Sequence, residues 1–232
     1  MSVKLARDKL AKMFQLPFNL QYQEYFDAQD FIVSNSNQVA VNLISNWPNW
    51  PHVCVYLLGP KSSGKTYLAK IWQQMSGAYV ISKNDFTDDF LSQNLPALKN
   101  VLIDDVDELI ANNADGERIL FHIYNVIKEH QGSLLLTASK SISELQLALP
   151  DLSSRLNASL EIKIAEPDDY LVRELLKRLF IQQQVFVSEE VIAYLTLHIE
   201  RSFTSVVRMA KDLNQLSLSL HKPITLALAK KI

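Results

Sequence analysis

A glycine-containing run between an apolar segment and a helical segment is the feature that most constrains how this chain can fold. The apolar segment covers residues 53–58, and the helical segment begins at Tyr67. Between them stand, in order, Gly59, Pro60, Lys61, Ser62, Ser63, Gly64, Lys65 and Thr66, a complete G-x-x-x-x-G-K-[ST] pattern. A strand, such a loop and a helix in this order predict that loop N–H groups meet phosphate oxygens at the positive end of the helix.

The same loop predicts the roles of individual residues in a nucleotide site. Lys65 is expected to reach the β and γ phosphates, and Thr66 is expected to bind Mg²⁺. The whole chain contains only five glycines, so two of them within one short run argue against a chance turn. We therefore predict that the chain binds a nucleoside phosphate together with Mg²⁺. The loop alone leaves kinases, GTPases and motor ATPases open.

Composition and charge exclude several classes of protein. A formal net charge of −2 argues against broad coating of nucleic acid, which requires a basic surface. The single cysteine, Cys54, permits no internal disulfide and is expected to be a small buried hydrophobe, which suits a reducing compartment. Residues 1–14 hold no continuous apolar run, and the histidines show no metal-ligand spacing. We expect a cytoplasmic protein without a membrane span and without a metal other than Mg²⁺.

Alternating patterns along the chain predict an α/β core with a parallel sheet. Strands are expected at residues 53–58, 78–81, 100–104, 133–137 and 160–164. Helices are expected near residues 39–44, 67–72, 89–91, 117–129 and 142–147. Strands that alternate with helices in this way favour a three-layer arrangement, with helices on both faces of the sheet.

The strand pattern stops at about residue 165, and helical patterns follow. The first of these helices is expected to begin at Asp168 and Asp169, because acids are favoured in a first helical turn. Two more are expected to begin near Ser188 and Thr204. We therefore predict a tail over residues 1–22, a nucleotide-binding core over residues 23–165 and a small all-α lid over residues 166–232.

Polar residues follow two of the predicted core strands. Asp104 is expected to hold Mg²⁺ beside Thr66, and Asp105 is expected to orient or deprotonate an attacking water. The alternative interpretation is that these acids cap the next helix or are merely solvated. Ser139 follows the strand that ends at Thr137, and it is expected to sense the γ-phosphate, although hydroxyls after strands often cap helices.

Two arginines extend the predicted site. Arg155 precedes the last core strand, at the edge of the core, where it is better placed for a neighbour's γ-phosphate than for its own. Arg208 stands near the start of a lid helix and is expected to reach the chain's own nucleotide. The alternatives are a surface salt bridge for Arg155 and a solvent-exposed helix position for Arg208.

Taken in order, these motifs resemble an AAA+ ATPase core with its helical lid, and in detail the DnaA-related branch. The stretches that carry the resemblance are residues 31–40 (FIVSNSNQVA), 121–125 (FHIYN) and 151–156 (DLSSRL), within a likeness that covers nearly all of residues 14–220. The first stretch resembles the family's opening motif, which lies near the adenine. The resemblance therefore implies that the nucleotide is ADP or ATP, and it adds Phe31, Val33 and Asn37 to the expected contacts. Tyr67, which follows the phosphate loop, is also expected to contact the nucleotide.

Two features favour the Hda family, the regulatory inactivators of DnaA, over DnaA itself. DnaA carries a DNA-binding domain after its lid, whereas this chain stops at Ile232, so no sequence-specific DNA binding is expected. A short stretch around Pro17 resembles the clamp-binding peptide of the Hda family, with an extended backbone and apolar side chains that suit a groove. Its expected contacts are Gln15, Leu16, Phe18 and Leu20.

The resemblance implies a negative regulator of DNA replication initiation. Its implied partners are DnaA and the DNA polymerase III β sliding clamp, which would associate the protein with the bacterial nucleoid. Arg155 would enter the nucleotide site of DnaA and promote hydrolysis there. The intact loop also leaves open a self-sufficient homo-oligomeric ATPase, although Thr137 and Ser139 depart from the Ser-Asp pair that many DnaA sequences have at this strand end. A homodimer and a purely structural clamp partner are further alternatives.

Overall fold

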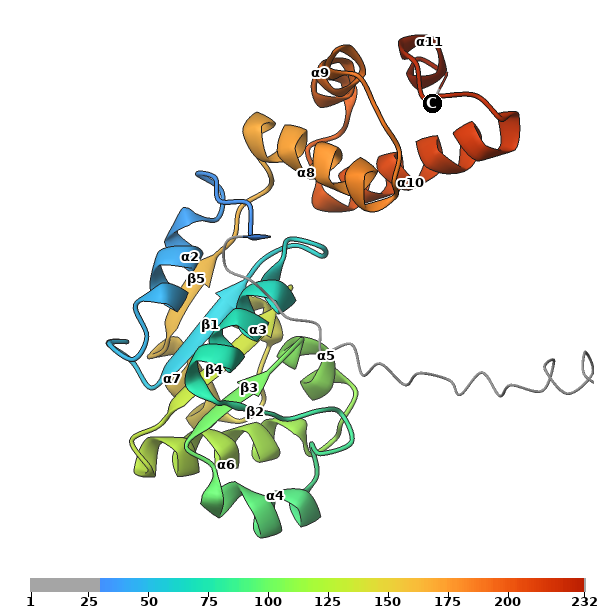
Figure 1. Ribbon diagram of the computed structural model, residues 1–232. Helices are drawn as coiled ribbons and strands as arrows, with labels where there is room; N and C mark the ends of the chain where they lie inside the picture. The colour runs from blue at the N-terminus through green and yellow to red at the C-terminus, as the bar shows by residue number, and fades with distance from the viewer. Residues whose placement is uncertain (1–29, 232) are drawn as a thin grey trace, which may run out of the picture.

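A computed structural model of the chain, which describes residues 30–231, contains a parallel five-stranded sheet (Figure 1). The strand order is β2-β3-β4-β1-β5, and every neighbouring pair runs parallel. The strands are β1 (Cys54–Leu58), β2 (Tyr79–Val80), β3 (Asn100–Ile103), β4 (Ser133–Ala138) and β5 (Leu160–Lys163). Because all strands point the same way, their carboxyl ends meet at one edge of the sheet, where ligands bind in open α/β folds.

Helices cover both faces of this sheet. One face carries α2 (Gln38–Ser45) and α3 (Lys65–Ser76). The other face carries α4 (Asp88–Asn94), α5 (Val106–Ala111), α6 (Gly116–Glu129) and α7 (Pro150–Asn157). Single 3₁₀ turns lie at Leu95–Ala97 and Ile142–Leu145. The core therefore has three layers.

Strand β1 shows how the sequence builds these layers. All five of its residues are buried, as expected for a central strand of a parallel sheet. Cys54, Tyr56 and Leu58 belong to the cluster under α6 and α7, whereas Val55 and Leu57 belong to the cluster under α2 and α3. This alternation follows from the two-residue period of a strand. The sheet thus separates two hydrophobic clusters.

The helices after β5 form a third hydrophobic cluster of their own. They are α8 (Asp169–Gln182), α9 (Glu189–His198), α10 (Phe203–Leu220) and α11 (Leu226–Ala229). Figure 1 shows them beyond the carboxyl edge of the sheet. Leu171 and Phe203 are buried with the core cluster under α2 and α3, so these two side chains fix the lid to the core.

The predicted architecture, a parallel sheet between helical layers followed by a helical segment, is confirmed, and several elements differ in extent. The helix expected near residues 142–147 is only a 3₁₀ turn, because a capping box between Ser141 and Glu144 opens it and Gln146 ends it in the left-handed conformation. No helix was predicted at the positions of α5, α7 and α11. No helix within residues 30–231 is long and apolar enough to span a membrane.

The turn before β4 leads to a prediction about stability. A Cβ on Gly132 would lie 1.7 Å from the carbonyl oxygen of Lys99, which accepts a hydrogen bond from the backbone N–H of Ser133. We expect Gly132→Ala to lower the free energy of unfolding by about 2–3 kcal/mol, because the β3–β4 junction must move.

Gly77 supplies the control for this substitution. Its φ is +63° and no atom lies within 4 Å of its added Cβ, so Gly77→Ala introduces backbone strain without a clash. We expect a cost of about 1 kcal/mol there. Urea denaturation measures both variants, and equal losses would show that the close approach at Gly132 does not constrain the sheet.

Candidate nucleotide-binding site

The phosphate loop joins the end of β1 to the start of α3. Gly64 has a φ of 88°, in the left-handed region, and a Cβ there would lie 2.8 Å from the Phe31 ring. The N-terminus of α3 has no side-chain cap, which leaves its N–H groups for an anion. Ser63 Oγ is buried without a hydrogen-bond partner among the described residues. An uncapped helix start and an unpartnered hydroxyl fit a ligand rich in acceptor oxygens.

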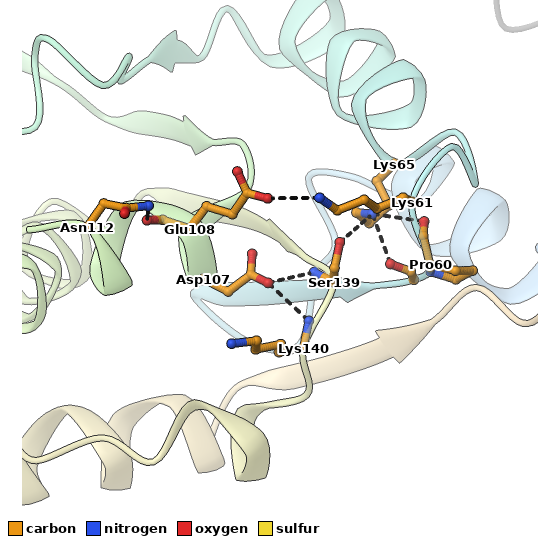
Figure 2. Close-up of polar contacts among 9 residues, drawn as sticks. Pro60, Lys61, Lys65, Asp107, Glu108, Asn112, Ser139 and Lys140 are labelled. Carbon is orange, nitrogen blue, oxygen red and sulfur yellow. Dashed lines mark hydrogen bonds and ion pairs between the residues drawn. The ribbon is translucent and has the colours of Figure 1, made fainter. Parts of the chain in front are cut away.

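Lys65 lies folded inside this loop. Its Nζ donates to the carbonyl oxygens of Gly59 at 2.9 Å and Pro60 at 3.1 Å, and to Ser139 Oγ at 3.3 Å (Figure 2). Burial lowers the pKa of Lys65, and the carboxylates of Asp105 and Asp104 act in the opposite direction. The cationic amine therefore lies between the loop carbonyls and the end of β4, where the sequence predicted that it would meet phosphate.

The two predicted magnesium ligands lie together. Thr66 Oγ1 donates to Asp104 Oδ2 at 2.8 Å, across the gap between α3 and the end of β3. Thr137 Oγ1 donates to the other carboxylate oxygen at 2.5 Å and accepts from the Asp105 N–H at 2.9 Å. A hydroxyl and a carboxylate are hard oxygen donors of the kind that Mg²⁺ prefers. The residues present thus fit this ion, and Thr137 orients Asp104.

Asp105 lines the cavity of the loop, which measures about 480 Å³. The other lining residues are Lys61, Ser62, Ser63, Gly64, Lys65, Thr66, Glu108 and Ser139. Burial raises the pKa of Asp105, and the neighbouring Asp104 raises it further. A carboxylate that takes up protons more readily than usual beside a phosphate loop is suited to act as a base.

A second cavity of about 200 Å³ lies between the core and the lid. Phe31 and Tyr67 line it on the core side, with ring centroids 5.6 Å apart. Asn37 also lines it and shapes the preceding loop, because its amide donates to the Ile32 carbonyl at 2.9 Å and accepts from the Ser34 N–H at 2.9 Å. Val33 is half-buried and does not line this cavity. A slot with aromatic walls and a few polar groups suits a planar base.

The lid side of this second cavity was not anticipated from the sequence. Leu171, Leu175 and Arg178 line it from α8, and Arg178 also forms an ion pair with Asp30 at 2.8 Å. Their spacing of four and three residues was a readable signal, since it places them on one face of a helix. Arg208, the predicted lid contact, lies exposed on α10 and does not line the cavity.

Arg155 lies in the last turn of α7, half-buried against the core. Its guanidinium lies over the ring of Tyr124 on α6, 5.9 Å from the ring centroid. It lines neither the loop cavity nor the cavity below the lid. The predicted clamp contacts Gln15, Leu16, Phe18 and Leu20 lie outside the described residues.

A phosphate loop after β1, a strand β3 that leads into two aspartates, and a helical lid define a P-loop protein of the AAA+ type. Residues 20–163 match the family model of the bacterial DnaA ATPase domain, so the chain belongs to that family. This confirms the predicted DnaA-related AAA+ class and leaves the finer assignment to the Hda branch as a proposal.

Individual relatives agree with this family. An uncharacterized protein of Haemophilus influenzae is 27% identical over 226 residues, covering 94% of this chain and 97% of the relative. The chromosomal replication initiator protein DnaA of Nautilia profundicola is 24% identical, covering 88% of this chain and 51% of the relative. The chain therefore spans about half the length of this DnaA.

Solved structures show the same fold. Domain III of the Thermotoga maritima replication initiation protein DnaA superposes with a TM-score of 0.73 at 17% identity, covering 88% of this chain and 93% of that one. AMPPCP-bound DnaA from Aquifex aeolicus superposes with a TM-score of 0.63 at 21% identity, covering 82% of this chain and 64% of that one.

The raised pKa of Asp105 predicts a dependence of stability on pH. A carboxyl whose folded-state pKa exceeds its ordinary value of 3.8 favours folding below that value, and this contribution is lost as pH rises through the folded pKa. We expect Asp105→Asn to melt at a higher temperature than the parent at pH 8, by a margin that shrinks as pH falls towards 4.5.

Asparagine also tolerates the left-handed backbone of position 105, where φ is 49°. That benefit does not vary with pH, whereas the removal of a crowded charge does. Calorimetric melting of the nucleotide-free protein across this pH range separates the two effects. A margin that stayed constant with pH would show that the Asp105 carboxyl titrates normally.

Proposed function

We propose that this protein binds ADP or ATP with Mg²⁺ in the cavity of the phosphate loop, and the adenine in the cavity below the lid. The observation that carries this proposal is the convergence of Lys65, Thr66, Asp104 and Ser139 from three separate elements onto one loop. The DnaA of Aquifex aeolicus, which has the same fold, was solved with AMPPCP bound, and this supports an adenine nucleotide as the ligand.

In this proposal each part of the chain has a defined task. Loop N–H groups and Lys65 hold the phosphates, and Thr66 and Asp104 hold the metal ion, which neutralises charge between the phosphates. Phe31 and Tyr67 contact the base. Because Arg178 lines the base cavity from the lid, bound nucleotide bridges lid and core and fixes the angle between them.

We further propose that the nucleotide-bound protein acts on DnaA as an Hda-type regulator of replication initiation. Membership of the DnaA ATPase family supports a head-to-tail contact with a related AAA+ domain. Arg155 supports it as well, because its guanidinium lines neither cavity of its own chain. In a neighbour's site it would stabilise charge on the γ-phosphate.

Clamp binding through residues 15–20 is a further part of this proposal. A tether on the sliding clamp would raise the effective concentration of a weak contact with DnaA. The protein is then expected where the clamp is loaded on DNA, in the bacterial cytoplasm.

A second candidate function is a self-sufficient homo-oligomeric AAA+ ATPase. It is favoured by Asp105, a carboxyl with a raised pKa in the loop cavity, which suits a base that activates water. Incubation of the purified chain alone with ATP separates the two functions: sustained turnover favours the ATPase, and its absence favours the regulator.

Lys65→Ala tests nucleotide binding. The substitution removes the only loop amine that is buried among the phosphate-binding residues, so we expect the affinity for MgADP to fall at least about hundredfold. Lys61→Ala is the matched control, because Lys61 is exposed and pairs with Glu108. Equal, small losses in both variants, measured by isothermal titration calorimetry, would refute the proposed site.

Arg155→Ala tests the action on DnaA. We expect this variant to bind MgADP and the clamp normally, and to lose about hundredfold or more of its stimulation of ATP hydrolysis by DnaA when the DNA-loaded clamp is present. Arg118→Ala is the control, because Arg118 is exposed on α6 and pairs with Asp88 and Asp115. Phosphate release measures the rate, and undiminished stimulation by Arg155→Ala would remove the arginine from the mechanism.

A further inference from the structure

A buried carboxylate close to the phosphate loop has no role in the site as described so far. Asp107 lies in the first turn of α5 and is only 6% exposed. Its Oδ2 accepts hydrogen bonds from the backbone N–H groups of Ser139 and Lys140, each at 3.1 Å (Figure 2). One carboxylate oxygen thus holds two successive residues at the end of β4.

The other oxygen of Asp107 makes the arrangement unusual. Oδ1 is buried and has no hydrogen-bond partner among residues 30–231. Burying a carboxylate is costly unless its oxygens are paired. A side chain that served only to pack α5 would be cheaper as an apolar residue. The two backbone N–H groups are therefore the reason that a carboxylate fits this position.

Lys140 is also held by a side chain from β1. Tyr56 Oη donates to the Lys140 carbonyl at 2.7 Å. Burial raises the pKa of Tyr56, so its hydroxyl keeps the proton that it donates. Asp107 holds the N–H groups and Tyr56 holds the carbonyl, so the backbone of the segment has little freedom to shift. Its side chains are consequently placed by α5 and β1 together.

The Ser139 side chain connects this fixed segment to the phosphate loop. Ser139 Oγ lies 3.3 Å from Lys65 Nζ, and Ser139 lines the loop cavity. Asp107 stands two residues after Asp105 in the sequence. Its hydrogen bonds to Ser139 and Lys140 therefore join the β3–α5 junction to the end of β4. The hydroxyl therefore lies beside Lys65 at the loop cavity, on a backbone segment that Asp107 holds.

We propose that Asp107 is a positioning residue that fixes Ser139 against Lys65 and so sets the affinity for the terminal phosphate of the nucleotide. The inference rests on the proposed binding of nucleotide in the loop cavity and adds a determinant of its selectivity. A hydroxyl held beside the lysine contributes one more hydrogen bond when a γ-phosphate is present. The selectivity between triphosphate and diphosphate is then partly a property of α5.

A double-mutant cycle tests this inference. Binding of AMPPCP and of ADP, each with Mg²⁺, is measured by calorimetry for the parent, Asp107→Ala, Ser139→Ala and the double variant. We expect Asp107→Ala to weaken AMPPCP binding about tenfold and ADP binding less. In the Ser139→Ala background we expect it to have little further effect, because a positioning residue acts through the residue that it places.

Two matched variants guard against general damage to the fold. Asp107→Asn keeps an oxygen for both N–H groups, so we expect at most about a threefold loss for AMPPCP. Lys140→Ala keeps the backbone N–H and removes an exposed side chain, so we expect parental binding. If Asp107→Ala does not fold, Tyr56→Phe releases the Lys140 carbonyl of the same segment and is expected to show the same dependence on Ser139.

The possible outcomes separate this inference from the proposed function. An Asp107→Ala loss that is the same for ADP and AMPPCP, or the same in both Ser139 backgrounds, would overturn the positioning role. Parental binding by Asp107→Ala would overturn it as well. Nucleotide binding that survives Lys65→Ala would instead refute the proposed site itself, whatever Asp107 does.

Discussion

The parallel register of three central strands places the polar groups at the strand ends of the candidate site. Leu58 at the end of β1 pairs with Ala138 in β4, so Gly59 and Ser139 leave the sheet side by side. Ile103 at the end of β3 pairs with Leu136, which sets Asp104 beside Thr137. A slip of one residue would turn each of these side chains to the opposite face. The hydrophobic clusters on both faces of the sheet hold this register.

Charge and burial determine which ligand suits the site at these strand ends. One buried lysine, Lys65, lies within the electrostatic reach of three carboxylates, those of Asp104, Asp105 and Asp107. Burial, and after it the neighbouring acids, raise the pKa of Asp105, whereas Lys65 lowers it. A site with this charge balance favours a ligand that brings both anionic oxygens and a divalent cation. The nucleotide–magnesium complex has that composition, and the family of the chain agrees with it.

Much of this arrangement could be predicted from the sequence because its signals are local. The loop pattern contains Lys65 and Thr66 within eight consecutive residues, 59–66. The apolar strand before Asp104 shows where it ends, because its apolar residues give way to two acids. The roles of Thr137 and Asp107 could not be predicted, because they depend on the register between β3, β4 and α5. The same limit applies to the lid: Arg178 lines the base cavity rather than Arg208 because of how α8 packs on the core.

The most direct test of this account is a ¹⁵N–¹H NMR titration of the parent protein with MgADP. The account predicts saturable shifts in the backbone amides of residues 61–66, together with amides of α8 that adjoin Leu175 and Arg178. Shifts confined to another surface, or the absence of any saturable shift at millimolar MgADP, would contradict it.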